Sequence, residues 1–384
     1  MELWRLSVPT FILQPVSMLE KLSHYSSPNE IIKNVHKNER PEGRFLQVLN
    51  WLLSNWRTIP RHGLEASKPY NPILGEIFKC EWEHQDGSKA KFIAEQISHH
   101  PPVSAFEMSD PSNGDFKYSA WVYPQTTISY YVASIMTGEF NVSFVPEGQT
   151  QREVYSLKQP PVSCTGILYG EKYIEIYDKM ELTCANTNLH AEITFESGGT
   201  NALSGKVYRV MEDGEREDVY EVSGVINQKV EATNARTKST QVLFDTKTLQ
   251  RLKKNIRPVA EQDENESRRV WHHLTKALKE KNFDDAQLQK HIVEERERTR
   301  RKKITEEHLK KNPPQPKKEE KPAVVESSWT SSLWSIGSSV VTAMVGSEES
   351  SEQKEDSHHK FGHPGFEPVY FADPTGENHW TVKQ

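Results

Sequence analysis

Glu95-Gln-Ile-Ser-His99-His100-Pro101-Pro102 ends an alternating run of apolar and polar residues with two histidines and two prolines. Proline fixes its own φ and disfavours helical geometry in the residue before it, so the stretch predicts a strand that stops at a rigid corner. The imidazoles of His99 and His100 titrate near neutral pH, and a neighbouring anion favours their charged form. The sequence therefore predicts a phosphate-binding corner at the end of a strand.

Short alternating runs surround this stretch from about residue 70 to residue 244. They are rich in Val, Ile, Thr and aromatic residues, are separated by Gly, Asn, Asp or Pro, and include 73–82, 91–97, 116–123, 128–135, 139–145, 173–183, 189–195, 206–211 and 219–226. About ten or eleven strands at this spacing, with no long helix between them, are typical of an antiparallel barrel or sandwich. We expect a mainly β fold of the α+β kind, and the pattern disfavours a parallel α/β enzyme.

Helical patterns flank the β-rich region. Before it, an apolar stripe recurs at helical spacing, with Pro60 following as a stop: Phe45, Val48, Leu49, Leu52, Leu53 and Trp56. After it, a second stripe consists of Val270, Trp271, Leu274 and Leu278. A charged helical run then extends from about 284 to 310, where prolines open a linker. Such stripes predict helices that pack one face on a larger body.

The composition limits what the chain can do. Its 384 residues allow one large domain with a tail or two ordinary domains, and a net charge of −6 disfavours nucleic acid as a partner. Cys80, Cys164 and Cys184 form neither a metal-ligand pair nor an even disulfide framework, so we expect reduced thiols in the cytosol, with no metal or cofactor. No secretory signal opens the chain, and its apolar runs fall short of the roughly 18 residues that cross a bilayer. We expect peripheral, reversible membrane contact.

Three separated segments supply candidates for binding a phosphate group. The candidates are Lys68, Asn71, His99, His100, Lys290, Glu294 and Arg298. The first two stand among prolines just before a strand, and the histidines form the corner described above. The last three follow at intervals of four, which places them on one helix face over about 12 Å.

Each kind of candidate suits a phosphomonoester. Lysine supplies a point charge, arginine a bidentate donor and imidazole an adjustable donor. Taken singly, each group also has an ordinary structural explanation: a salt-bridge ladder on a solvated helix, the end of a strand, or a surface lysine. The coincidence of all three with the pattern of one family favours the binding site.

These segments resemble the three phosphoinositide-contacting elements of the oxysterol-binding-protein-related lipid-transfer family. Two further stretches, 266–271 and 9–13, are similar to family sequence in the same order. The resemblance covers about residues 4 to 310, with a weaker match at the end. It is strongest to short, yeast-type members that lack a pleckstrin-homology domain.

The resemblance implies an incomplete antiparallel β-barrel that encloses a hydrophobic tunnel, with helices on either side in the sequence. It also implies phosphatidylinositol 4-phosphate as the headgroup ligand of the seven candidates. A second lipid would occupy the tunnel in turn and be exchanged between membranes, with sterol as the first choice. We expect a monomer that is cytoplasmic and reversibly associated with contact regions between the endoplasmic reticulum, the Golgi and the plasma membrane.

The same resemblance implies a division of the chain into three parts. A lipid-binding domain would span 1–310, with a lid and helical lead in 1–60, the barrel in 61–250 and C-terminal helices in 262–310. A linker with a Ser- and Trp-rich insert would follow in 311–360. The last segment, 361–384, would pack back on the domain.

The insert offers a replacement for the usual lid, since only eight residues precede Pro9. An uncharged amphipathic helix is predicted there, and such a helix inserts bulky groups into loosely packed membranes. The residues expected to contact the membrane are Trp329, Leu333, Trp334, Ile336 and Val340. A disordered linker whose tryptophans dock on the body is the alternative.

Rival functions stay open at this point. An enzyme is disfavoured because the sequence contains no Gly-x-Ser-x-Gly, P-loop or His-Glu-x-x-His motif. A phosphoinositide sensor that binds without transferring would use the same headgroup site. Phosphatidylserine is the alternative to sterol as second lipid.

Overall fold

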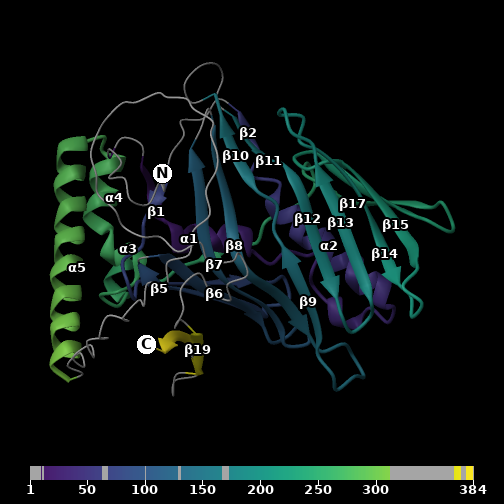
Figure 1. Cartoon of the computed structure of the whole chain (residues 1–384), viewed down its shortest axis with the longest axis horizontal. Helices are drawn as coiled ribbons and strands as arrows, with labels where there is room; N and C mark the ends of the chain where they lie inside the picture. Colours follow the sequence, from purple (N-terminus) through teal and green to yellow (C-terminus); the bar gives the residue numbers. More distant parts are fainter. Residues whose placement is uncertain are drawn as a thin grey trace, which may run out of the picture. The chain divides into compact units, whose positions relative to one another are not determined.

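The computed structural model describes residues 10, 13–62, 68–99, 101–128, 131–166, 173–311, 367–372 and 378–383. The chain divides into two compact units, one formed by Met1–Glu297 with Phe361–Gln384 and the other by Arg298–Lys360. The first unit contains the large sheet (Figure 1). His100 and the five predicted membrane-contact residues of the insert lie outside the described residues.

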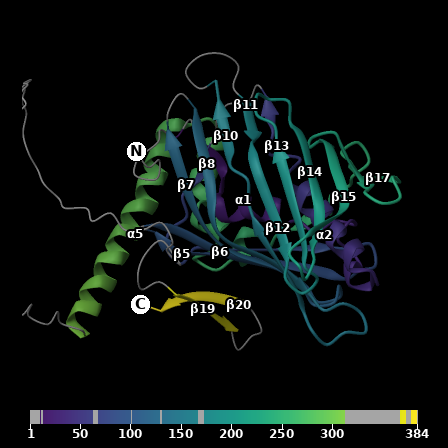
Figure 2. The same cartoon turned by 45° about the vertical axis from the view of Figure 1, so that its right-hand side comes forward.

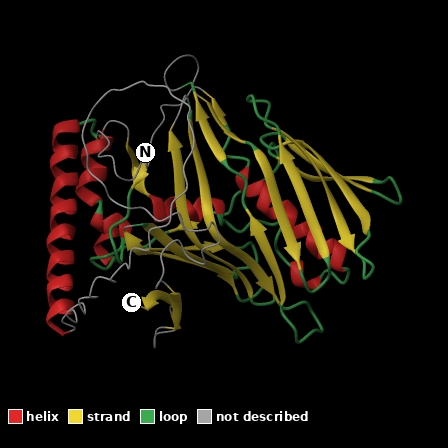
Figure 3. Cartoon of the chain, in the orientation of Figure 1, coloured by secondary structure: helices red, strands yellow, loops and turns green. Residues whose placement is uncertain are grey.

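Sixteen of the described strands form one antiparallel sheet (Figure 3). In chain order they are β2 (Arg61–His62), β4 (Ile77–Glu83), β5 (Lys89–His99), β6 (Pro102–Asp110), β7 (Phe116–Ile128), β8 (Val132–Phe144), β9 (Glu153–Lys158), β10 (Val162–Thr165), β11 (Tyr173–Ile176), β12 (Asp178–Cys184), β13 (Leu189–Phe195), β14 (Ala202–Val210), β15 (Arg216–Val225), β16 (Lys229–Asn234), β17 (Thr240–Asp245) and β18 (Lys254–Asn255). The main path runs β17–β16–β15–β14–β13–β12–β9–β8–β7–β6–β5–β4–β18, and β10, β11 and β2 branch from β8.

The sheet curls without closing. Its end strands, β17 and β18, each pair with a single neighbour among the described strands, so the ring of hydrogen bonds that defines a closed barrel is incomplete. The expected incomplete antiparallel β-barrel with flanking helices is therefore confirmed.

Alternation along each strand separates the two faces of the sheet. In β9, Glu153, Tyr155 and Leu157 are buried while the residues between them are exposed. Successive side chains of a strand point to opposite faces, so this period of two produces one core-facing side. On that side Phe92 and Phe106 stack with ring centroids 5.7 Å apart.

Several strand boundaries differ from the sequence prediction, and two of the differences have a backbone explanation. The runs 128–135 and 139–145 were expected as two strands, but Ile128 ends β7 and β8 continues from Val132 to Phe144. Gly138 permits this, since it adopts a φ of 155° at a point where a Cβ would collide with the backbone oxygen of Trp121. The run 173–183 was expected as one strand and is instead β11 and β12. Asp178, at the start of β12, has a left-handed φ of 64°, which interrupts the extended backbone.

The helix α2 (Pro41–Trp56) packs on the core-facing side of the sheet (Figure 2). All six residues of its predicted apolar stripe are buried, which confirms that prediction. The ring of Trp51 meets Phe116 and Tyr118 edge-on at centroid distances of 5.5 and 5.2 Å. Each fully buried side chain of this size contributes about 1.5–3 kcal/mol to folding, so α2 is a major part of the core.

The N-terminal lead contains β1 (Leu13–Ser17), α1 (Met18–Tyr25) and the short 3-10 helix η3 (Val35–Lys37). The strand β1 pairs in parallel with β3 (Lys68–Tyr70) to form a separate two-stranded sheet. This pairing holds the lead against the segment that carries two of the candidate residues.

The C-terminal helices are α3 (Ser267–Val270), α4 (His272–Lys279) and α5 (Phe283–Lys311), preceded by the 3-10 helix η4 (Val259–Glu261). A second apolar cluster joins them to β3: Tyr70, Trp271, Leu274, Ala277 and Ala286. The rings of Tyr70 and Trp271 lie 5.0 Å apart. This cluster fixes the start of α5 on the β1–β3 pair.

A hairpin of β19 (Glu367–Ala372) and β20 (Asn378–Lys383) lies near the C-terminus of the chain. The expected packing of 361–384 on the domain stays a prediction. All three cysteines are free, as predicted. Among the described residues, no helix combines the length and apolar character needed to cross a membrane.

Candidate functional site

A cavity of about 320 Å³ lies on the core-facing side of the sheet, between α1, the end of α2 and strands β6, β7, β8 and β10. Its wall is mostly apolar and includes Met18, Leu22, Trp56, Phe106, Val122, Met136, Phe140 and Ile174. The polar groups include Gln14, Lys21 and Gln159. Pockets for small apolar ligands range from about 300 to 1,000 Å³, so the size and composition fit such a ligand.

Lys68 lies beside this cavity. It begins β3, pairs with Leu13 of β1, and precedes Pro69, which forms part of the cavity wall. Burial, and then the positive charge of Lys290, lower the pKa of Lys68 below its usual range. The two ammonium groups, which come from distant parts of the chain, therefore repel each other. A bound anion would relieve that repulsion.

Lys290 comes from the inward side of α5. Only 8% of its surface is exposed, and its Nζ lies 3.1 Å from Oε1 of Glu294, one helical turn further on. The side chain of Glu294 is 45% exposed, so water screens this pair and it contributes little to stability. The contact confirms that the two residues share a helix face; their binding of a headgroup stays a prediction.

His99 ends β5, and β6 begins at Pro102, so the predicted strand end at the corner is confirmed. The Nδ1 of His99 lies 3.1 Å from the carbonyl oxygen of Pro72. Because a carbonyl only accepts, Nδ1 carries the hydrogen of this bond. Protonation of the ring would therefore place its second hydrogen on Nε2, which would turn that nitrogen into a donor suited to a phosphate oxygen.

Asn71 belongs to a loop that connects β3 with β4. The loop turns at Gly75, whose φ of 74° lies in the left-handed region that glycine adopts without strain. The Gly75 N–H donates to the carbonyl of Gln96 in β5 at 2.8 Å. This bond and the contact of His99 with Pro72 hold the Asn71 loop against the end of β5.

The structure thus brings together the segments that carry Lys68, Asn71, His99 and Lys290. Arg298 follows on α5, is exposed, and is the first residue of the second compact unit. The participation of Arg298 and His100 stays a prediction.

Sequence reasoning did not single out Glu20, which anchors the cavity-wall helix α1. Its carboxylate accepts hydrogen bonds from Nη2 and Nε of Arg268 at 2.7 and 3.0 Å and from Nζ of Lys254 at 3.5 Å. Burial raises the pKa of Glu20, but Arg268 and Lys254 outweigh it and the pKa is lowered overall. The sequence signal that could have indicated this role is the acidic residue Glu20 among the apolar residues of α1.

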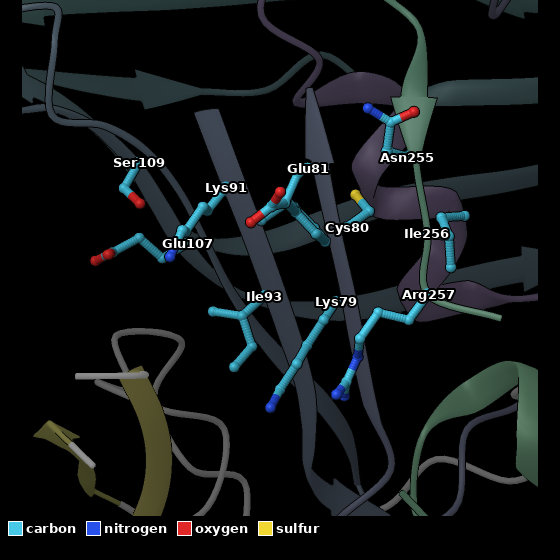
Figure 4. A pocket seen from close by; sticks show the side chains of 11 residues that line it. Lys79, Cys80, Glu81, Lys91, Ile93, Glu107, Ser109, Asn255, Ile256 and Arg257 are labelled. Atoms are coloured by element: carbon cyan, nitrogen blue, oxygen red, sulfur yellow. The ribbon is translucent and has the colours of Figure 1, made fainter. Parts of the chain in front are cut away.

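A second hollow, of about 410 Å³, lies over strands β4, β5, β6 and β18 and the segment after β18. Figure 4 shows that charged side chains of both signs line it, among them Lys79, Lys91, Arg257, Glu81 and Glu107. None of the predicted phosphate-binding residues that the structure describes contributes to its wall. This mixed surface lacks the apolar character of the cavity beside Lys68, so the cavity is the better candidate site.

Comparison with known proteins identifies the family. The oxysterol-binding protein family model matches residues 1–277. The chain belongs to the oxysterol-binding protein family. Within this family, the oxysterol-binding protein-like protein OBPa of Candida albicans is 33% identical over 306 residues, which cover 78% of this chain and 68% of that protein.

Solved structures share the fold. The crystal structure of the Osh1 ORD domain in complex with cholesterol is similar with a TM-score of 0.64 at 22% identity, covering 80% of this chain and 78% of the other. The Osh3 ORD of Saccharomyces cerevisiae in complex with PI(4)P is similar with a TM-score of 0.61 at 19% identity, covering 78% and 81%. At these identities the likeness establishes the fold alone.

Proposed function

We propose that this protein is a lipid carrier that binds phosphatidylinositol 4-phosphate and a second lipid one at a time and exchanges them between membranes. The observation that carries the proposal is an apolar cavity with Lys68 next to its wall, where the positive charge of Lys290 acts on Lys68. The ORD structures support it, since one similar domain was crystallised with PI(4)P and another with cholesterol. The headgroup would be held by Lys68, Asn71, His99, His100, Lys290, Glu294 and Arg298.

A phosphoinositide headgroup matches the charge of the site. The 4-phosphate carries about −1.5 to −2 charges near neutral pH and offers several acceptor oxygens. Binding it beside Lys68 and Lys290 would turn their mutual repulsion into two attractions. His99 would add an N–H donor from the end of β5.

The cavity matches the apolar part of a lipid. Exposing a lipid to water costs about 0.8 kcal/mol per methylene, so spontaneous transfer across the cytosol faces a barrier on the order of 20 kcal/mol. A cavity lined by Met18, Leu22 and Phe106 would replace that water with apolar contact. If two lipids compete for one cavity, a gradient of the phosphoinositide drives the other lipid, because each delivery empties the site.

Sterol is our first choice for the second lipid, in keeping with the cholesterol-bound Osh1 domain. Phosphatidylserine is the alternative cargo. The proposed carrier is a non-catalytic monomer in the cytoplasm that contacts membranes reversibly, at regions where endoplasmic reticulum, Golgi and plasma membrane approach one another. A sensor that binds without transferring has no need of the cavity, so the cavity favours the carrier.

A transfer assay between two liposome populations tests the proposal. Donor vesicles of phosphatidylcholine contain phosphatidylinositol 4-phosphate, and acceptor vesicles contain sterol or phosphatidylserine. We expect the protein to move the phosphoinositide forward and one of the other lipids back, and the double variant His99→Ala/His100→Ala to lose extraction of the phosphoinositide.

Two outcomes would contradict the proposal. Normal extraction by the double variant would refute the site, and binding without any transfer would favour the sensor.

A further inference from the structure

Glu76 is a fully buried carboxylate at the end of the Asn71 loop. Its Oε1 accepts hydrogen bonds from the hydroxyls of Ser17 and Ser267 at 2.5 and 2.7 Å. Its Oε2 accepts from the indole Nε1–H of Trp271 at 2.9 Å and from the backbone N–H of Ile73 at 3.1 Å. Both oxygens of the carboxylate are therefore engaged by donors.

The four donors come from three segments that are far apart in the sequence. Ser17 ends β1, Ile73 belongs to the same loop as Glu76, Ser267 begins α3, and Trp271 directly follows that helix. The single carboxylate therefore joins the N-terminal lead, the loop after β3 and the start of the C-terminal helices.

Each of these segments supports a different part of the candidate site. The strand β1 pairs with Lys68, and the Ile73 loop supplies the Pro72 carbonyl that orients His99. Trp271 packs on Tyr70 and precedes α4, whose apolar face joins the start of α5, the helix that carries Lys290. A shift at Glu76 would move these groups relative to one another.

The two oxygens place different demands on a substitute. Trp271 Nε1–H and the Ile73 N–H can only donate, so Oε2 must be replaced by an acceptor. The hydroxyls of Ser17 and Ser267 can donate or accept, so an amide nitrogen is tolerable at Oε1. Glutamine can therefore keep the network, whereas alanine leaves two buried N–H groups without an acceptor, which is costly.

We propose that Glu76 is the positioning residue of the headgroup site: it holds the loop that orients His99 and the helix pair that presents Lys290 in one fixed arrangement. This inference rests on the proposed function. It predicts that Glu76 affects headgroup affinity without touching the ligand.

The test compares three variants at a temperature where each is folded. Glu76→Ala removes the network, Glu76→Gln retains it, and Asp110→Ala is the matched control. Asp110 is also buried and accepts hydrogen bonds, from His84 and Ser112, but it lies at the opposite end of β6 from the corner. The readout is extraction of phosphatidylinositol 4-phosphate from phosphatidylcholine vesicles.

We expect Glu76→Ala to weaken extraction about tenfold or more. A loss of this size follows when one hydrogen bond between the site and the charged headgroup is misplaced. Glu76→Gln should recover most of it, and Asp110→Ala should extract like the wild type. Hydrogen exchange supplies a readout without lipid: the Ile73 amide should exchange faster in Glu76→Ala and slowly in Glu76→Gln.

Equal extraction by Glu76→Ala and Asp110→Ala would overturn the positioning role. If Glu76→Ala fails to fold, Trp271→Phe provides the test, because it keeps an aromatic ring in the packed position and removes one of the four donors to Glu76. Wild-type extraction by Trp271→Phe would also overturn the positioning role of Glu76. A wild-type protein that extracts no phosphoinositide would instead refute the proposed function, so the two failures are distinguishable.

Discussion

At the scale of single residues, the candidate site depends on two lysines whose charges act on each other. Lys68 is half-buried, and both its burial and the positive charge of Lys290 disfavour its ammonium form. The nearby carboxylate of Glu294 pairs with Lys290 from an exposed position. The two lysines are the groups expected to attract an anionic headgroup.

Removing one lysine should change the titration of the other. In Lys290→Ala we expect the pKa of Lys68 to rise toward its usual value, because the repulsion is gone while the burial remains. Titration of the lysine side chains followed by NMR measures this. Lys276→Ala, an exposed change on α4, is the control and should leave Lys68 unchanged.

A histidine outside the site should make stability depend on pH. Burial, and then the charges of Lys254 and Lys21, lower the pKa of His24 from its ordinary value of 6.5 to about 4. Between these two values the unfolded chain binds more protons than the folded chain, so the free energy of unfolding should fall as the pH drops from 6.5 to about 4. Urea unfolding across this range checks it, and His24→Gln should flatten the slope; an unchanged slope would contradict the assignment to His24.

The environment of a residue could not be predicted from the sequence where its partners come from distant segments. Glu76 follows Lys68 by only eight residues, but its donors Ser267 and Trp271 come from a segment about 190 residues later. Nothing local indicates such partners. The histidine corner was predictable because proline acts on its immediate neighbours.

At the scale of elements, the strongest periodicities gave correct predictions. The stripe of α2 and the alternation of strands such as β9 are local patterns that follow from helix and strand geometry. Short strands such as β2 and β18, with two residues each, exist only through partners elsewhere in the chain. The alternation of apolar and polar residues does not predict how such short strands pair.

The helix α2 should contribute to stability without acting on the site. Leu49→Ala removes a fully buried side chain from its packed face and should cost about 2–5 kcal/mol of unfolding free energy. Denaturant unfolding measures the loss. Phosphoinositide extraction at a temperature where the variant is folded should be unchanged, and a loss there would indicate that α2 also shapes the site.

At the scale of the whole molecule, the proposed function links the cavity to membranes through segments beyond the described residues. The insert 326–346 was predicted to contact loosely packed membranes through Trp329, Leu333 and Ile336, among others. An uncharged amphipathic helix of this kind gains little from anionic lipid.

Deleting 326–346 should therefore reduce binding to small neutral liposomes more than to large ones, because packing defects increase with curvature. Flotation of the full chain and the deletion variant with both liposome sizes measures this. Equal binding by the two proteins would contradict a membrane-sensing insert and favour the linker alternative.

The proposed exchange requires one cavity that serves two lipids in turn beside one headgroup site. Native mass spectrometry of the full chain, after incubation with vesicles that contain both phosphatidylinositol 4-phosphate and sterol, tests this directly. We predict one bound lipid per protein, either of the two, with the phosphoinositide lost in Lys68→Ala/Lys290→Ala and the sterol retained. Both lipids bound at once, or phosphoinositide bound undiminished by the double variant, would contradict the account.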